Sequence, residues 1–229
     1  MRSFAKILLA AAAAASTLLI ASGAEASTLV GAITADNEYN AYLSTSDAAL
    51  GSLVATGAWW PTAQTFSAPL NAGQTYYLHV IANNWYGPGN MGGGNPDALL
   101  GSFSLSDASH SFSNGLQTLG TDAMNWRADA NSFVQNLGAI TTWNAPGGSP
   151  VGFAANGGAI WGAVLGGPVG GISNSAQWIW SGSDPSGEAF FSTTISAAGG
   201  VPEPAAWSLL LTGFFGIGAL LRRRAIVMG

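Results

Sequence analysis

The side chains that most often perform acid–base or nucleophilic chemistry are few in this chain. It has two histidines and no cysteine. His79 falls within an alternating apolar stretch, so we expect a packed structural residue, whereas His110, in SDASHSFSNG, is expected in a solvated loop. Neither a Gly-x-Ser-x-Gly elbow nor a His-Glu-x-x-His motif occurs. Since no feature selects two of its acids as a catalytic pair, we predict that the protein is not an enzyme.

A glycine-rich stretch at residues 87–92, GPGNMG, matches the dinucleotide-binding pattern letter for letter. That mechanism needs a helix that begins within the motif, so that its amides hold a pyrophosphate. Pro88 and Pro96, with the glycines between them, prevent such a helix. We therefore predict a loop here, and no nucleotide cofactor.

Two groups of residues could bind ligands. Asp36, Asn37, Glu38 and Asp47 supply carboxylate and amide oxygens, which calcium prefers, and a structural calcium ion or a merely solvated turn would both fit them. Aromatic rings beside amides suit the apolar faces and hydroxyls of sugars. The candidates for such a site are Trp59, Trp60, Asn83, Asn84, Trp85 and Tyr86.

Each of these tryptophans could instead be a core residue. Trp59 and Trp60 are adjacent, however, and in an extended segment neighbouring side chains point to opposite sides. We therefore expect one of the two rings to be exposed.

The charge of the central part of the chain limits its partners. Residues 27–200 carry nine acids and a single base, Arg127, for a net charge of −8. Without a basic patch, nucleic acid is excluded as a partner. A neutral or sugar-rich partner fits such a surface.

The hydrophobic pattern predicts short strands separated by turns. Alternation is clear in QTYYLHVIAN (residues 74–83), and similar segments occur at 38–45, 98–106, 176–181 and 188–196. The sequences NAGQ (71–74) and GSDPSG (182–187) are typical of turns. Residues 121–138 fit a short helix and, equally well, a strand at NWRA followed by a loop. We predict one all-β domain, an antiparallel sandwich.

The N-terminal residues are predicted to be a secretory signal peptide. Arg2 and Lys6 precede an apolar stretch, and Ala24 and Ala26 form a small-x-small pattern before a cleavage site. We expect a signal helix within residues 1–26, export through the Sec translocon, and removal by signal peptidase after Ala26.

The C-terminal residues 201–229 are predicted to be a sorting signal. Residues 205–221, roughly 17 residues, are apolar and just long enough for a transmembrane helix. Arg222, Arg223 and Arg224 follow and favour a cytoplasmic tail. Together with Pro202, Glu203 and Pro204, this order resembles the PEP-CTERM tail of Gram-negative bacteria. The resemblance implies that an exosortase-type membrane protease processes the protein and delivers it to the cell surface or extracellular matrix.

The body, residues 27–200, resembles galactose-binding-like jelly-roll modules. The resemblance rests on TADNEYNAYLST, YYLHVIANN, TDAMNWRA and the closing AQWIWSGSD…AFFSTTI. It implies a carbohydrate-binding or adhesive module. We therefore expect an exported protein that is membrane-anchored before processing and then binds exopolysaccharide without catalysis. A structural matrix protein without a specific ligand, and a carbohydrate-active enzyme, are the alternatives.

Overall fold

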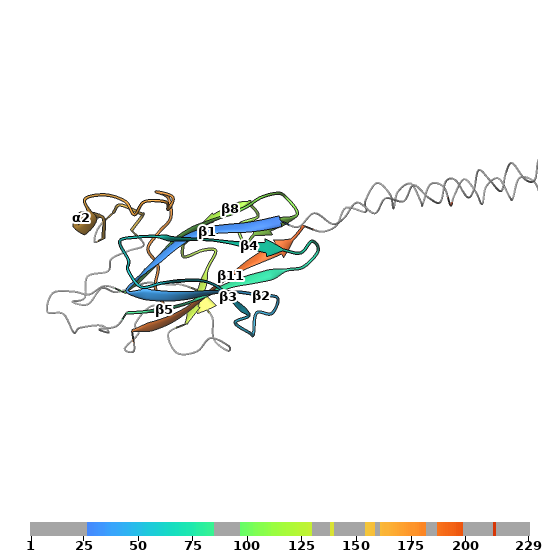
Figure 1. Ribbon diagram of the computed structural model, residues 1–229, viewed down its shortest axis with the longest axis horizontal. Helices are drawn as coiled ribbons and strands as arrows, with labels where there is room; N and C mark the ends of the chain where they lie inside the picture. The colour runs from blue at the N-terminus through green and yellow to red at the C-terminus, as the bar shows by residue number, and fades with distance from the viewer. Residues whose placement is uncertain are drawn as a thin grey trace, which may run out of the picture. The chain divides into compact units, whose positions relative to one another are not determined.

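The computed structural model describes residues 27–84, 97–129, 138–139, 154–158, 161–181, 187–198 and 213. The chain in these ranges forms two antiparallel β-sheets, which Figure 1 shows as an upper layer with β1, β4 and β8 and a lower layer with β2, β3, β5 and β11. One short helix, α2 (Trp161–Leu165), accompanies them. The predicted all-β, antiparallel class is confirmed, and two layered sheets are compatible with a sandwich.

The two sheets differ in size and order. The four-stranded sheet has the order β4 (Gln64–Leu70), β1 (Ser27–Asp36), β6 (Ala98–Leu105), β8 (Thr118–Gly120). The seven-stranded sheet has the order β10 (Gly138–Ala139), β9 (Arg127–Asp129), β11 (Glu188–Ala197), β5 (Tyr76–Asn83), β2 (Glu38–Ser44), β3 (Ser52–Gly57), and β7 (His110–Phe112) also pairs with β11.

Strands that were predicted from alternation agree with the structure. In β5, Tyr76, Leu78 and Val80 are buried on one face. The strands β2, β6 and β11 coincide with three further predicted segments. The predicted turn at residues 71–74 is also confirmed, with Gly73 at a φ of 73° and the Gln74 amide donating to the Asn71 carbonyl at 3.3 Å.

A single hydrophobic core joins the sheets. Leu29 and Ile33 of β1, Leu78 of β5 and Phe191 of β11 are all fully buried and belong to one cluster. This core lies within a compact unit that spans Ala26–Ala198. The strand β1 was not predicted; it begins at Ser27, the residue after the expected cleavage site, and pairs with both β4 and β6.

The structure describes residues 121–129 and 138–139 of the segment 121–138, for which a helix and a strand were both predicted. In residues 121–129 the strand alternative is correct. Asp122 accepts hydrogen bonds from the Met124 and Asn125 amides, at 2.8 and 2.6 Å, which closes a turn. Trp126 is then buried, and β9 follows directly. The helix alternative is wrong for residues 121–129, because the short polar side chain of Asp122 satisfies the local amides in a turn.

The segment AQWIWS is extended but makes only isolated bridges. Ile179 pairs with Leu99, and Gln177 pairs with Ala155. Trp178 and Trp180 are 2% and 0% exposed and belong to the hydrophobic core.

Both predicted end signals lie outside the described residues, apart from Gly213. Among the residues that the structure does describe, no helix is long and apolar enough to span a membrane.

Candidate functional site

The loop between β3 and β4 presents one exposed aromatic ring. The side chain of Trp59 is 67% exposed, while its neighbour Trp60 packs against the core. The Thr34 hydroxyl donates to the Trp60 carbonyl at 2.9 Å, which ties the loop to β1. The Trp60 ring also meets the edge of Trp178, with ring centroids 6.4 Å apart and planes at 71°. The loop that carries the exposed Trp59 ring is therefore tied to the core.

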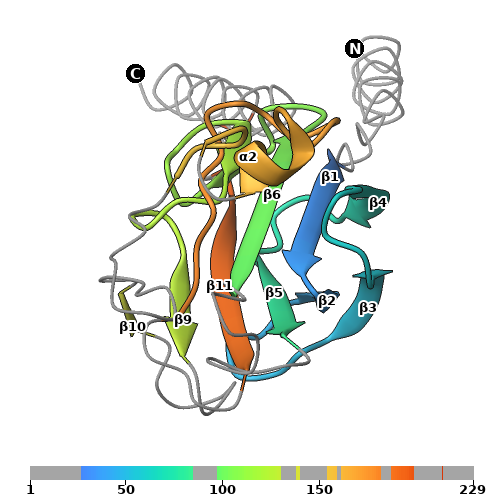
Figure 2. The ribbon, with the colours of Figure 1, turned by 90° about the vertical axis from the view of Figure 1, so that its left-hand side faces the viewer.

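Beneath this loop lies a stack of buried tryptophans. Trp161 of α2 stacks on Trp178, with centroids 4.3 Å apart and an interplanar angle of 18°. Figure 2, viewed from the end at which α2 lies in Figure 1, shows α2 in front of β6. The Nε1 of Trp161 donates to Asp36 Oδ2 at 3.1 Å. This contact joins residues 125 positions apart and had no signal in the sequence.

Asp36 is an acid in an apolar setting at the end of β1. Its side chain is 5% exposed, and its second oxygen accepts a hydrogen bond from Asn37 Nδ2 at 3.0 Å. Burial raises the pKa of Asp36 to about 6, although the Trp161 hydrogen bond lowers it in part. Asp36 therefore titrates just below neutral pH.

Two of the predicted sugar-binding residues, Asn83 and Asn84, follow one another at the end of β5, next to Asn37. The Asn37 amide donates to the Asn83 carbonyl at 3.0 Å. Asn84 is 1% exposed, and its Nδ2 donates to the buried Asp97 carboxylate. Asn83 is half-buried at the end of β5, opposite Glu38. Asn84 thus has a structural role, and Trp85 and Tyr86 lie outside the described residues.

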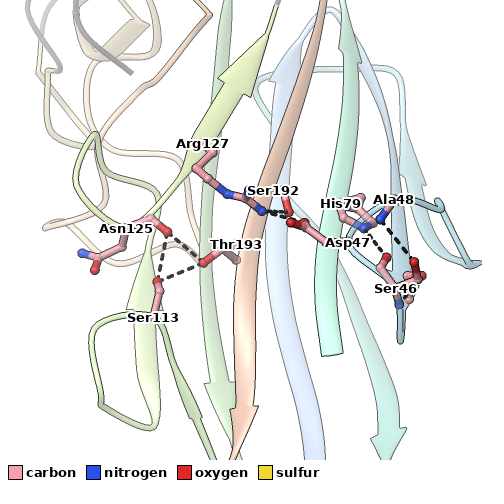
Figure 3. Close-up of polar contacts among 10 residues, drawn as sticks. Ser46, Asp47, Ala48, His79, Ser113, Asn125, Arg127, Ser192 and Thr193 are labelled. Carbon is pink, nitrogen blue, oxygen red and sulfur yellow. Dashed lines mark hydrogen bonds and ion pairs between the residues drawn. The ribbon is translucent and has the colours of Figure 1, made fainter. Parts of the chain in front are cut away.

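The four candidate calcium ligands are not brought together. Asp47 lies beside Ser192 and His79, which pair with each other in the seven-stranded sheet. Its Oδ1 forms an ion pair with Arg127 Nη2 at 2.6 Å, which Figure 3 shows. Glu38 pairs with Asn83, which lies four residues along β5 from His79. The strand position beside Glu38 and the one beside Asp47 are therefore about 13 Å apart. In the ranges that the structure describes, no group of three His, Asp or Glu side chains could hold a metal ion.

Both histidines are buried and have structural roles. His79 is fully buried; its Nε2 lies 3.3 Å from the Ser46 carbonyl, as Figure 3 shows, and burial lowers its pKa. His110 was expected in a solvated loop, and that expectation is wrong. It is fully buried in β7, with Nε2 3.0 Å from the Gln74 carbonyl and Nδ1 3.1 Å from the Ser109 hydroxyl.

No family model, curated protein or solved structure matches this chain.

Proposed function

We propose that this protein is exported, sorted by an exosortase-type protease, and binds exopolysaccharide at the cell surface or in the extracellular matrix without catalysing a reaction. The sorting steps rest on the two terminal sequence patterns. The binding activity rests on the body, to which we assign a galactose-binding-like jelly-roll fold. The two antiparallel sheets and their common core support that assignment at the level of fold class.

The observation that carries the binding proposal is the exposed ring of Trp59. The Trp59 side chain is 67% exposed, so the face of its ring is open to a ligand. A pyranose ring has an apolar face that stacks on such a platform. Because Trp60 and Thr34 hold the loop, little conformational entropy is lost when the ligand binds.

Replacement of Trp59 with alanine is expected to weaken polysaccharide binding about tenfold or more, the loss typical of a central aromatic contact. The measurement is binding of the purified protein to a polysaccharide panel that includes the host's own matrix, with and without calcium. Met124→Ala is the matched control, because Met124 is an exposed apolar side chain, 92% exposed, on a different loop.

Binding that survives Trp59→Ala unchanged would contradict the proposed platform. If the unaltered protein binds none of the polysaccharides, the alternative of a structural matrix protein without a ligand is favoured. A dependence on calcium would support a bound ion, although the structure does not gather the four predicted ligands in one place.

The sorting proposal predicts the ends of the mature protein. Protein isolated from its host's surface is expected to begin at Ser27 and to lack Trp207–Gly229, because signal peptidase and the exosortase-type protease each remove one end. Intact-mass measurement tests both cuts. A surface protein that retains Trp207–Gly229 would contradict C-terminal processing, and protein from a host lacking the protease is the control.

A further inference from the structure

The four-stranded sheet carries a groove of about 640 Å³, and its lining includes the core residues Ala32, Phe103 and Leu119. Hydroxyl side chains line it, and we call it the serine groove. Its hydroxyl residues are Thr65, Ser102, Ser104, Thr118, Ser173 and Ser175. They come from three of the four strands and from the segment that follows α2.

Strand register explains why these hydroxyls share one face. Val30 lies opposite Ser104, and Ser104 lies opposite Thr118, so the three side chains form one row across the sheet. Leu29 is fully buried in the core, so its neighbour Val30 points to the outer side, where it is 44% exposed. The hydroxyls in this row therefore point outward too.

Small side chains create the hollow. Ala32, with Ser102 opposite it, forms the floor, while the 173–175 segment and the turn that holds Leu116 form walls. The wall is tied to the floor, because the Ser173 amide donates to Ser102 Oγ at 3.3 Å. The Ser173 and Ser175 hydroxyls lie 2.9 Å apart.

The lining is neutral and amphipathic, and this defines its ligand. The residues that line the groove include hydroxyls and the exposed apolar side chains of Val30 and Leu116, the latter 58% exposed, but no acid or base. Hydroxyl groups donate and accept hydrogen bonds, and apolar patches cover the CH faces of sugars. An anionic polymer would find no base here, in a body whose net charge is −8.

The groove also lies near the Trp59 loop, although no residue of that loop lines it. Ala32 lies two residues from Thr34 on the same side of β1, about 7 Å away, and the Thr34 hydroxyl holds the Trp60 carbonyl. A ligand chain that leaves the groove past Ala32 would pass over the buried Thr34 before it met the Trp59 loop.

We propose that the serine groove binds one chain of a neutral polysaccharide, along the outer face of the four-stranded sheet with Trp59 near one end. This inference rests on the proposed carbohydrate-binding function and assigns its main contact surface and ligand class. The hydroxyl-lined floor, and not the aromatic ring alone, then carries affinity and selects neutral over anionic chains.

The test places a carboxylate in the groove. Ser104→Glu in the purified protein is expected to weaken binding of dextran, galactomannan or soluble β-glucan at least tenfold, because a charged side chain fills the floor. Thr118→Glu, on the short edge strand β8, is a second variant with less risk to folding. Thr56→Glu, an exposed threonine on β3 of the other sheet, is the matched control and is expected to bind as the unaltered protein does. Near-ultraviolet circular dichroism and the thermal midpoint check that each variant is folded.

The outcomes separate this inference from the function on which it rests. If Trp59→Ala loses binding while Ser104→Glu and Thr118→Glu do not, carbohydrate binding stands and the serine groove is overturned. If neither the neutral nor the anionic polysaccharides, nor the host's own matrix, bind the unaltered protein, both fall. Equal or stronger binding of an anionic polyuronate such as alginate would overturn the assignment to neutral chains.

Discussion

Replacement of Trp178 with alanine is expected to lower the free energy of unfolding by about 3–5 kcal/mol. The Trp178 side chain is 2% exposed, stacks on Trp161 and meets the edge of Trp60. Its removal would leave a large cavity between α2 and the β3–β4 loop, because two rigid rings cannot collapse to fill it. A loss of this size is a substantial fraction of the roughly 5–15 kcal/mol that stabilises a typical domain.

Urea unfolding followed by far-ultraviolet circular dichroism measures this loss. Trp59→Ala is the matched control, since it removes the same side chain where it is 67% exposed, and its effect on stability is expected within about 0.5 kcal/mol. A Trp178→Ala protein as stable as the control would mean that the tryptophan stack does not hold this region.

The same pair of variants separates stability from binding. Trp178→Ala removes the ring that supports Trp60, so polysaccharide binding should weaken as the loop loses its base. Trp59→Ala removes the exposed platform and leaves the stack in place. Lost binding with full stability in Trp59→Ala, together with lost stability in Trp178→Ala, would locate the ligand contact at the exposed ring.

The strands β2 and β5, which the sequence predicted, each have one face more buried than the other. In β5 the alternation is strict enough to give both the strand and its inward side chains. The strand β1 lacks that pattern, because Ala32, Thr34 and Asp36 on its outer side are buried as well as Leu29 and Ile33 on its inner side. Burial on both faces removes the period-2 signal from which a half-buried strand is predicted.

The site was predicted in part for a related reason. That one of two adjacent tryptophans must be exposed follows from local geometry alone, and the structure has Trp59 in that place. The Asp36–Trp161 hydrogen bond depends on two segments 125 residues apart. The serine groove depends on strand register, which sets Val30 opposite Ser104. Neither arrangement is encoded in any short stretch of sequence.

His110 illustrates how local composition can mislead. Four of its nine neighbours in SDASHSFSNG are serines, and Asp107, Asn114 and Gly115 are there too, a composition typical of turns. In the structure it pairs with Ala197 of β11, and the Gln74 carbonyl satisfies its ring. A buried polar side chain of this kind is stable only because a distant backbone group supplies its hydrogen bond.

Replacement of Asp36 with asparagine is expected to stabilise the protein at pH 7 by up to about 3 kcal/mol. Burial raises the pKa of Asp36 from its ordinary 3.8 to about 6 in the folded protein. Between these two pH values the folded protein holds a proton that the unfolded chain has released. The unaltered protein therefore loses stability as the pH rises from about 4 to about 6, and above that range it retains a buried charge that asparagine does not carry.

An asparagine at this position can still accept the Trp161 hydrogen bond through its Oδ1, which preserves the packing of α2. Its Nδ2 then faces Asn37, whose side-chain amide has to turn so that its oxygen accepts. Urea unfolding at a series of pH values from 4 to 7 measures the effect: the two proteins should be about equally stable near pH 4 and diverge as the pH rises. Asp107→Asn is the control of opposite sign. Hydrogen bonds from Ser109 hold the pKa of Asp107 below its usual range, so its carboxylate stabilises the folded protein above that range and this variant should be the less stable at pH 7. If Asp36→Asn is instead less stable than the unaltered protein at pH 7, the charged form of Asp36 must gain more from Trp161 and Asn37 than it loses through burial.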